Sequence, residues 1–137
     1  MEFSTEQVQG RTPITILGLQ GDLDGTNYQT LITKANELHQ AGARNFVLDM
    51  GKVNYMSSAG LVALHTIAQL LQGEPLPDPD AGWEAIHSIE RDEAAGKHAQ
   101  LKLLNPQSRV DQTLELTGMK EYFDIFTDRQ AAIASFN

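Results

Sequence analysis

Two hydrophobic patterns meet near the middle of the chain, and their order restricts the fold more than any other feature. Residues 46–50 (Phe-Val-Leu-Asp-Met) form a short apolar run typical of a buried strand. Leu61, Leu64, Ala68 and Leu71 follow at helical spacing. A strand that leads directly into a helix predicts an α/β fold, in which right-handed crossovers join the strands of a sheet.

The same alternation continues on both sides of this unit. We predict strands over residues 13–19, 43–50, 100–104 and 123–126, and helices over residues 26–40, 58–71, 105–117 and 128–136. Thr26 and Asp128 are the predicted N-caps of the first and last helices, and Gly42 and Gly118 are the predicted stops. Thr117 is expected to face the core, and Gly51-Lys52 is expected to form a turn after the central strand.

Two adjacent hydroxyls, Ser57 and Ser58, lie at the predicted start of the central helix. Backbone N–H groups there lack helical partners, and the helix dipole favours negative charge. A serine at this place can cap the helix or carry a phosphate, and the residues alone leave both roles open. Gly60 in the first turn costs about 1 kcal/mol relative to alanine, which indicates that another group approaches the backbone closely.

Composition narrows the class of function. The 137 residues suggest one domain, and the absence of cysteine excludes disulfides, thiol nucleophiles and thiolate metal sites. A net charge of −8 argues against nucleic acid and anionic membranes as partners. Residues 1–10 lack a signal-peptide pattern, and no apolar run is long enough to span a bilayer, so we expect a cytoplasmic protein. A protein partner or a small ligand remains.

Motifs for catalysis, metal binding or cofactor binding are not found in the sequence. The turn at residues 21–25 (Gly-Asp-Leu-Asp-Gly) lacks the remaining ligands of a calcium loop, and the four histidines have no paired metal spacing. Phosphate-loop and nucleophile-elbow motifs are absent, and the serine pair has no obvious base partner. We therefore expect no metal, no cofactor and no enzymatic activity.

Residues 73–99 break the pattern. Pro75, Pro77 and Pro79 forbid regular structure at the start of this segment. It holds seven acidic residues, Glu74, Asp78, Asp80, Glu84, Glu90, Asp92 and Glu93. We interpret it as an acidic insertion into a single domain that spans residues 1–137, either partly helical or a solvated loop.

Three segments resemble the STAS domain family, and specifically its stand-alone bacterial anti-sigma-factor antagonists. Residues 21–24 are similar to the G-x-[LI]-D turn of the family, and residues 56–61 (Met-Ser-Ser-Ala-Gly-Leu) to its [IM]-D-[ST]-[ST/A]-G-L loop. Residues 101–106 and 114–119 resemble its later strand and its L-x-x-[TS]-G-[LM] ending. The resemblance covers everything outside residues 73–99. It implies a mixed β-sheet with helices largely on one face.

The resemblance also implies a function. In such antagonists an anti-sigma-factor serine kinase phosphorylates the serine that corresponds to Ser58, and a phosphatase reverses the reaction. The unphosphorylated form binds the kinase through residues that correspond to Asp24, Ser57, Ala59 and Gly60. The family aspartate is replaced here by Ser57, which leaves Ser57 as a rival acceptor. Two other functions remain open: a nucleotide-binding STAS module, and a scaffold or transporter-accessory subunit that is never phosphorylated.

Overall fold

The computed structural model describes residues 1–73 and 98–136. Their strands form one sheet in the order β1-β2-β3-β4-β5. The strands are β1 (Glu2–Gln9), β2 (Pro13–Gln20), β3 (Phe46–Lys52), β4 (Leu101–Leu104) and β5 (Asp124–Phe126). The β1–β2 pair is antiparallel and the other neighbours are parallel, which confirms the mixed sheet.

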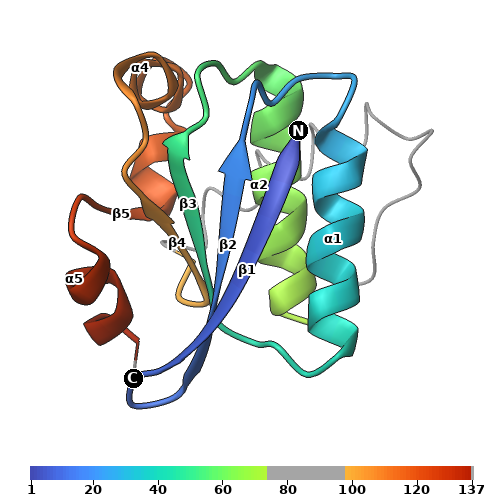
Figure 1. Cartoon of the computed structure of the whole chain (residues 1–137). Helices are drawn as coiled ribbons and strands as arrows, with labels where there is room; N and C mark the ends of the chain where they lie inside the picture. Colours follow the sequence, from blue (N-terminus) through green and yellow to red (C-terminus); the bar gives the residue numbers. More distant parts are fainter. Residues whose placement is uncertain (74–97, 137) are drawn as a thin grey trace.

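Most helices pack on one face of this sheet, as predicted. They are α1 (Tyr28–Gln40), α2 (Ser58–Leu71), α4 (Ser108–Leu116) and the 3₁₀ turn η2 (Met119–Tyr122). Each connection from β2 to β5 steps toward the same edge of the sheet, so crossovers of one hand place their helices on the same face. Buried residues of these helices join those of the central strands in the larger core, and Figure 1 shows α1 and α2 side by side.

The short helix α5 (Arg129–Ala134) lies on the other face of the sheet. Its Ala132 and the following Phe136 complete a smaller core with Ile14, Ile16 and Val47, together with Leu104. The predicted Asp128 cap is confirmed, because its carboxylate accepts a hydrogen bond from the N–H of Ala131. This helix covers only part of the face, and the rest is polar.

Several local predictions were wrong. Strand β1 was not predicted, because it is an edge strand with largely exposed side chains and no hydrophobic alternation. Asn27, not Thr26, precedes the first helix, since the Thr26 side chain and N–H bond to Asp24 instead. Gly51-Lys52 continues β3 rather than turning. Thr117 is exposed at the end of α4.

Other boundaries agree closely. The central helix runs from Ser58 to Leu71, as predicted. Gly42 and Gly118 follow α1 and α4 with φ of 115° and 77°, the left-handed conformation that glycine adopts most easily. Helix α4 starts at Ser108, three residues later than predicted, because Asn105 takes a positive φ of 53° and cannot begin a helix.

Only the ends of the predicted insertion, residues 73–99, are described. Gly73 closes α2, and its N–H donates to the carbonyl of Leu70. His98 is buried, and its ring lies 5.0 Å from that of Phe123. His98 therefore belongs to the packed domain, while the proline cluster and the acidic residues lie outside the described residues.

Candidate functional site

The serine loop lies at the carboxyl end of the parallel strands, beside the turn that follows β2. Leu23 of the turn and Met56 of the loop form an isolated parallel bridge. The Leu23 N–H donates to the carbonyl of Tyr55 at 2.9 Å, and the Ser57 N–H donates to the carbonyl of Leu23 at 2.9 Å. The bridge brings the Asp24 turn next to the Ser57-Ser58 pair, although the two segments lie far apart in the sequence.

The two serines have different structural roles. Ser57 has extended backbone angles and is the N-cap of α2, with its Oγ accepting from the Ala59 N–H at 3.2 Å. Its carbonyl accepts from the Gly60 N–H, and its own N–H is bonded to Leu23. Ser58 is the first residue of the helix, and its side chain is exposed. Ser57 is thus held by three internal bonds, whereas the Ser58 hydroxyl lies on the surface.

Packing explains why a glycine occupies position 60. It is buried, and a Cβ built on it would overlap Cγ of Met56 and lie 3.0 Å from Cγ of Leu23. The close approach predicted from the sequence therefore comes from two side chains of this protein. Gly60 therefore supports the site from the buried side, through its contacts with Met56 and Leu23. Its direct contact with a partner stays a prediction.

Asp24 organises its own turn. Its carboxylate accepts from the N–H of Thr26 at 2.9 Å and from the Thr26 hydroxyl at 2.5 Å, and its carbonyl accepts from the N–H of Tyr28. The side-chain and backbone hydrogen bonds from Thr26 hold the pKa of the Asp24 carboxyl below its ordinary value. Asp24 therefore carries a full negative charge at neutral pH, near the surface and next to the serine loop.

The serine loop also carries an exposed aromatic side chain that the sequence did not single out. Tyr55 is 46% exposed and directly precedes the Met56 bridge. The exposed residues Asn54 and Ser58 lie on either side of it along the loop. An exposed aromatic side chain within a polar loop is a common feature of protein-binding surfaces. No local pattern predicted its exposure, because exposure depends on the path of the loop beyond the end of the sheet.

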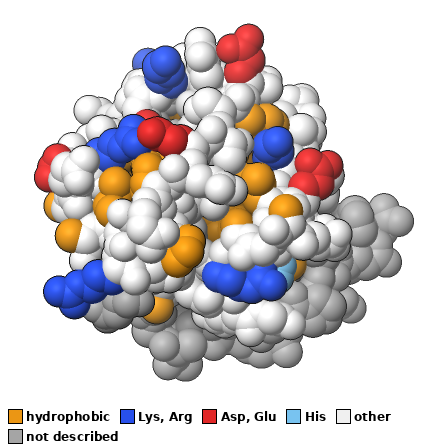
Figure 2. Space-filling model, turned by 60° about the horizontal axis from the view of Figure 1, so that its bottom comes forward, with side chains coloured by type: hydrophobic (Ala, Val, Ile, Leu, Met, Phe, Trp, Pro, Cys, Tyr) orange, Lys and Arg blue, Asp and Glu red, His pale blue; other side chains and the backbone are white. Residues whose placement is uncertain are grey.

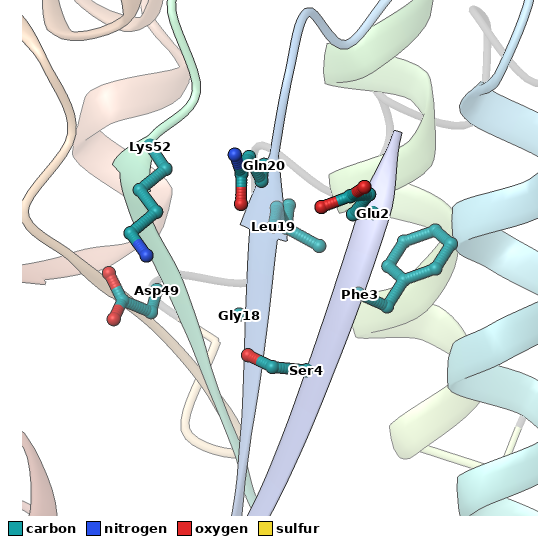
Figure 3. Close-up of a pocket in the computed structure, with 8 residues that line it drawn as sticks. All are labelled: Glu2, Phe3, Ser4, Gly18, Leu19, Gln20, Asp49 and Lys52. Carbon is teal, nitrogen blue, oxygen red and sulfur yellow. The ribbon is translucent and has the colours of Figure 1, made fainter.

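A separate hollow of about 210 Å³ lies on the polar part of the sheet face that α5 leaves uncovered. Figure 3 shows Ser4 pointing toward Gly18, and Asp49 and Lys52 on the neighbouring strand β3. Residues of the serine loop and the N-terminus of α2 do not line this hollow. Within residues 1–73 and 98–136, no three His, Asp or Glu side chains are grouped as metal ligands.

The helices were also compared with what a membrane span requires. Among the described residues, none of the helices combines the length and the apolar character that crossing a bilayer requires.

The fold is a small α/β domain whose serine loop lies at the carboxyl end of the parallel strands. The STAS domain family model matches residues 6–74, half of the chain, so this chain belongs to the STAS domain family.

Relatives agree with that assignment. BtrV of Bordetella bronchiseptica, by name a candidate anti-sigma factor antagonist, is 26% identical over 99% of this chain and 95% of its own length.

Solved structures share the fold. A candidate anti-sigma factor antagonist of Thermotoga maritima is similar with a TM-score of 0.69 and 17% identity, covering 96% of this chain and 91% of its own. The anti-sigma factor antagonist SpoIIAA in its unphosphorylated form has a TM-score of 0.57 and 18% identity, and the match covers 95% of this chain and 92% of SpoIIAA. The phosphorylated form of SpoIIAA from Bacillus has a TM-score of 0.51 and 17% identity, and the match covers 95% of this chain and 96% of SpoIIAA. At these identities the likeness to solved structures shows the fold alone.

Proposed function

We propose that this protein is an anti-sigma factor antagonist that binds an anti-sigma-factor serine kinase while Ser58 is unphosphorylated. One observation carries the proposal: the exposed Ser58 hydroxyl lies at a helix N-terminus, beside the charged turn of Asp24. Ser57 is the weaker acceptor, because its hydroxyl already caps α2. The similarity to BtrV and to SpoIIAA supports the same role.

The phosphate would act on the interface and leave the fold intact. A phosphoserine adds about −1.5 to −2 charges and three acceptor oxygens. At a helix N-terminus the dipole favours this charge by about 0.3–1 kcal/mol. The same charge on the exposed face, next to the Asp24 carboxylate, adds repulsion between like charges and must be desolvated when a complex forms. The kinase therefore releases the phosphorylated protein, and a cognate phosphatase restores binding.

In this role the protein is a binding partner and not an enzyme, because the kinase supplies the ATP chemistry. We propose that it acts in the cytoplasm and that Asp24, Ser57, Ala59 and Gly60 belong to or support the kinase-binding surface. On the face seen in Figure 2, the described residues mix Lys and Arg with Asp and Glu side chains, so they form no single-sign patch for nucleic acid there.

The test is a phosphate-transfer assay with the cognate kinase and ATP, followed by mapping of the modified residue by mass spectrometry. We expect one phosphate on Ser58, loss of labelling in Ser58→Ala and full labelling in Ser57→Ala. Labelling of Ser57 in the Ser58→Ala variant, at the rate of the unmodified protein, would refute the assignment. Absence of any binding to the kinase would favour the scaffold or transporter-accessory role.

The structure offers less support for the alternative of a nucleotide-binding module. The hollow on the open sheet face contains two carboxylates, Glu2 and Asp49, and a single cation, Lys52. That balance disfavours a triphosphate, so the geometry supports protein binding better than nucleotide binding.

A further inference from the structure

The turn of Asp24 and the loop of Ser58 extend beyond the regular sheet. The pairing of β2 with β3 becomes irregular between Gly18 and Gln20, and its last pair is Gln20 with Lys52. Past that point the two segments are joined by the bridge of Leu23 and Met56 and by its two backbone hydrogen bonds. Both side chains are buried, with 0% and 1% of their surface exposed.

The first turn of α2 packs directly on this bridge. A Cβ on Gly60 would overlap Cγ of Met56 and come within 3.0 and 3.1 Å of two carbons of Leu23. Because helical backbone and both side chains are in contact, three segments meet at one point. Gly25 is the contrast, because an added Cβ there meets nothing within 4 Å.

From this geometry we propose that Leu23, Met56 and Gly60 form a clamp that fixes the position of the Asp24 carboxylate relative to Ser58. Leu23 directly precedes Asp24, and Ser58 lies midway between Met56 and Gly60. Any displacement of the clamp therefore moves the charged turn and the serine relative to each other. The three residues are positioning residues, because all three are buried. That this spacing sets the affinity for the kinase rests on the function proposed above.

The clamp can be tested in the free protein. Gly60→Ala forces a methyl group into the contact, while Gly25→Ala adds a methyl group beside Asp24 in open space. By NMR hydrogen exchange we expect the Leu23 and Ser57 amides, which form the two bridge bonds, to exchange about tenfold faster in Gly60→Ala. We also expect the Asp24 resonances to shift. Unchanged exchange and unchanged shifts in Gly60→Ala would overturn the clamp.

The functional half of the proposal needs a control for lost stability. Ala132→Gly removes a buried methyl group under α5, on the opposite face of the sheet, and lowers stability without touching the clamp. We expect Gly60→Ala to lower the affinity for the kinase about tenfold, and Ala132→Gly to leave it near the wild-type value. Equal affinity losses in Gly60→Ala and Ala132→Gly at matched unfolding temperatures would overturn the positioning role.

A second variant keeps the test decisive if Gly60→Ala does not fold. Met56→Ala loosens the bridge without adding bulk, and it removes the Cγ that a methyl group at residue 60 would overlap. We expect Met56→Ala to speed exchange at Leu23, and the double variant Met56→Ala/Gly60→Ala to fold better than Gly60→Ala. Slow exchange in Met56→Ala would overturn the clamp. Fast exchange together with a wild-type protein that does not bind the kinase would support the clamp and refute the proposed function.

Discussion

Replacing each serine of the pair separately should show that Ser57 contributes to stability and that Ser58 does not. In Ser57→Ala the N–H of Ala59 loses its 3.2 Å acceptor in a partly buried position. Loss of a serine N-cap costs about 1 kcal/mol of unfolding free energy, with a range of about 0.5–2. For a domain of this size that corresponds to a fall of about 3–6 °C in unfolding temperature.

Ser58→Ala should behave differently. The Ser58 side chain is exposed, and alanine is the better helix former by a few tenths of a kcal/mol. We expect its unfolding temperature to stay unchanged or to rise slightly. Ser57→Asp is the matched control, because it keeps a capping oxygen and adds a charge that the helix dipole favours by about 0.3–1 kcal/mol. It should be at least as stable as the unmodified protein.

Thermal unfolding followed by circular dichroism measures all three variants, and a shift of the urea midpoint at constant m-value confirms that stability changed. The reasoning fails if Ser58→Ala loses as much stability as Ser57→Ala. It also fails if Ser57→Ala is as stable as the unmodified protein while Ser57→Asp is not, because the cap would then contribute nothing.

Four further predictions concern Ser58, Asp24 and the insertion. Ser58→Asp should keep its unfolding temperature and lose kinase affinity, measured by calorimetry; equal affinity would contradict the proposed switch. Asp24→Ala should weaken kinase binding with little change in stability, and a large fall in unfolding temperature with intact binding would show a structural role instead. The folded-state pKa of Asp24 lies below its ordinary value, so its contribution to the turn is present at neutral pH and is lost as pH falls through that pKa, which an NMR titration measures. We propose that residues 74–97 are an addition to a single domain, so a short Gly/Ser linker in their place, with His98 retained, should give a cooperatively folding protein. Red-shifted, quencher-accessible fluorescence of Trp83 would support this, and blue-shifted emission with an insoluble deletion variant would contradict it.

The sequence by itself determined the elements whose signals are local. The apolar stripe of α2 and the serine before it predicted that helix to the residue, because periodicity and capping depend on neighbours within a few positions. The same holds for the glycines that end α1 and α4 and for the Asp128 cap. The parallel pairing of neighbouring strands follows from the alternation of strands and helices along the chain. Because the crossover connections are right-handed, few arrangements of the strands in a sheet remain.

Features that depend on distant partners were decided only by the tertiary structure. Strand β1 forms because β2 offers an edge, although most of its own residues are polar and carry no alternating pattern. The two serines look equivalent in sequence, and their roles separate only where the loop binds Leu23 and the helix begins. The reason for Gly60 is likewise invisible locally, because the side chains of Leu23 and Met56 reach its backbone only after the turn and the loop have come together. Contacts of this kind join segments about 30 residues apart, and their energy depends on three-dimensional packing that no local pattern records.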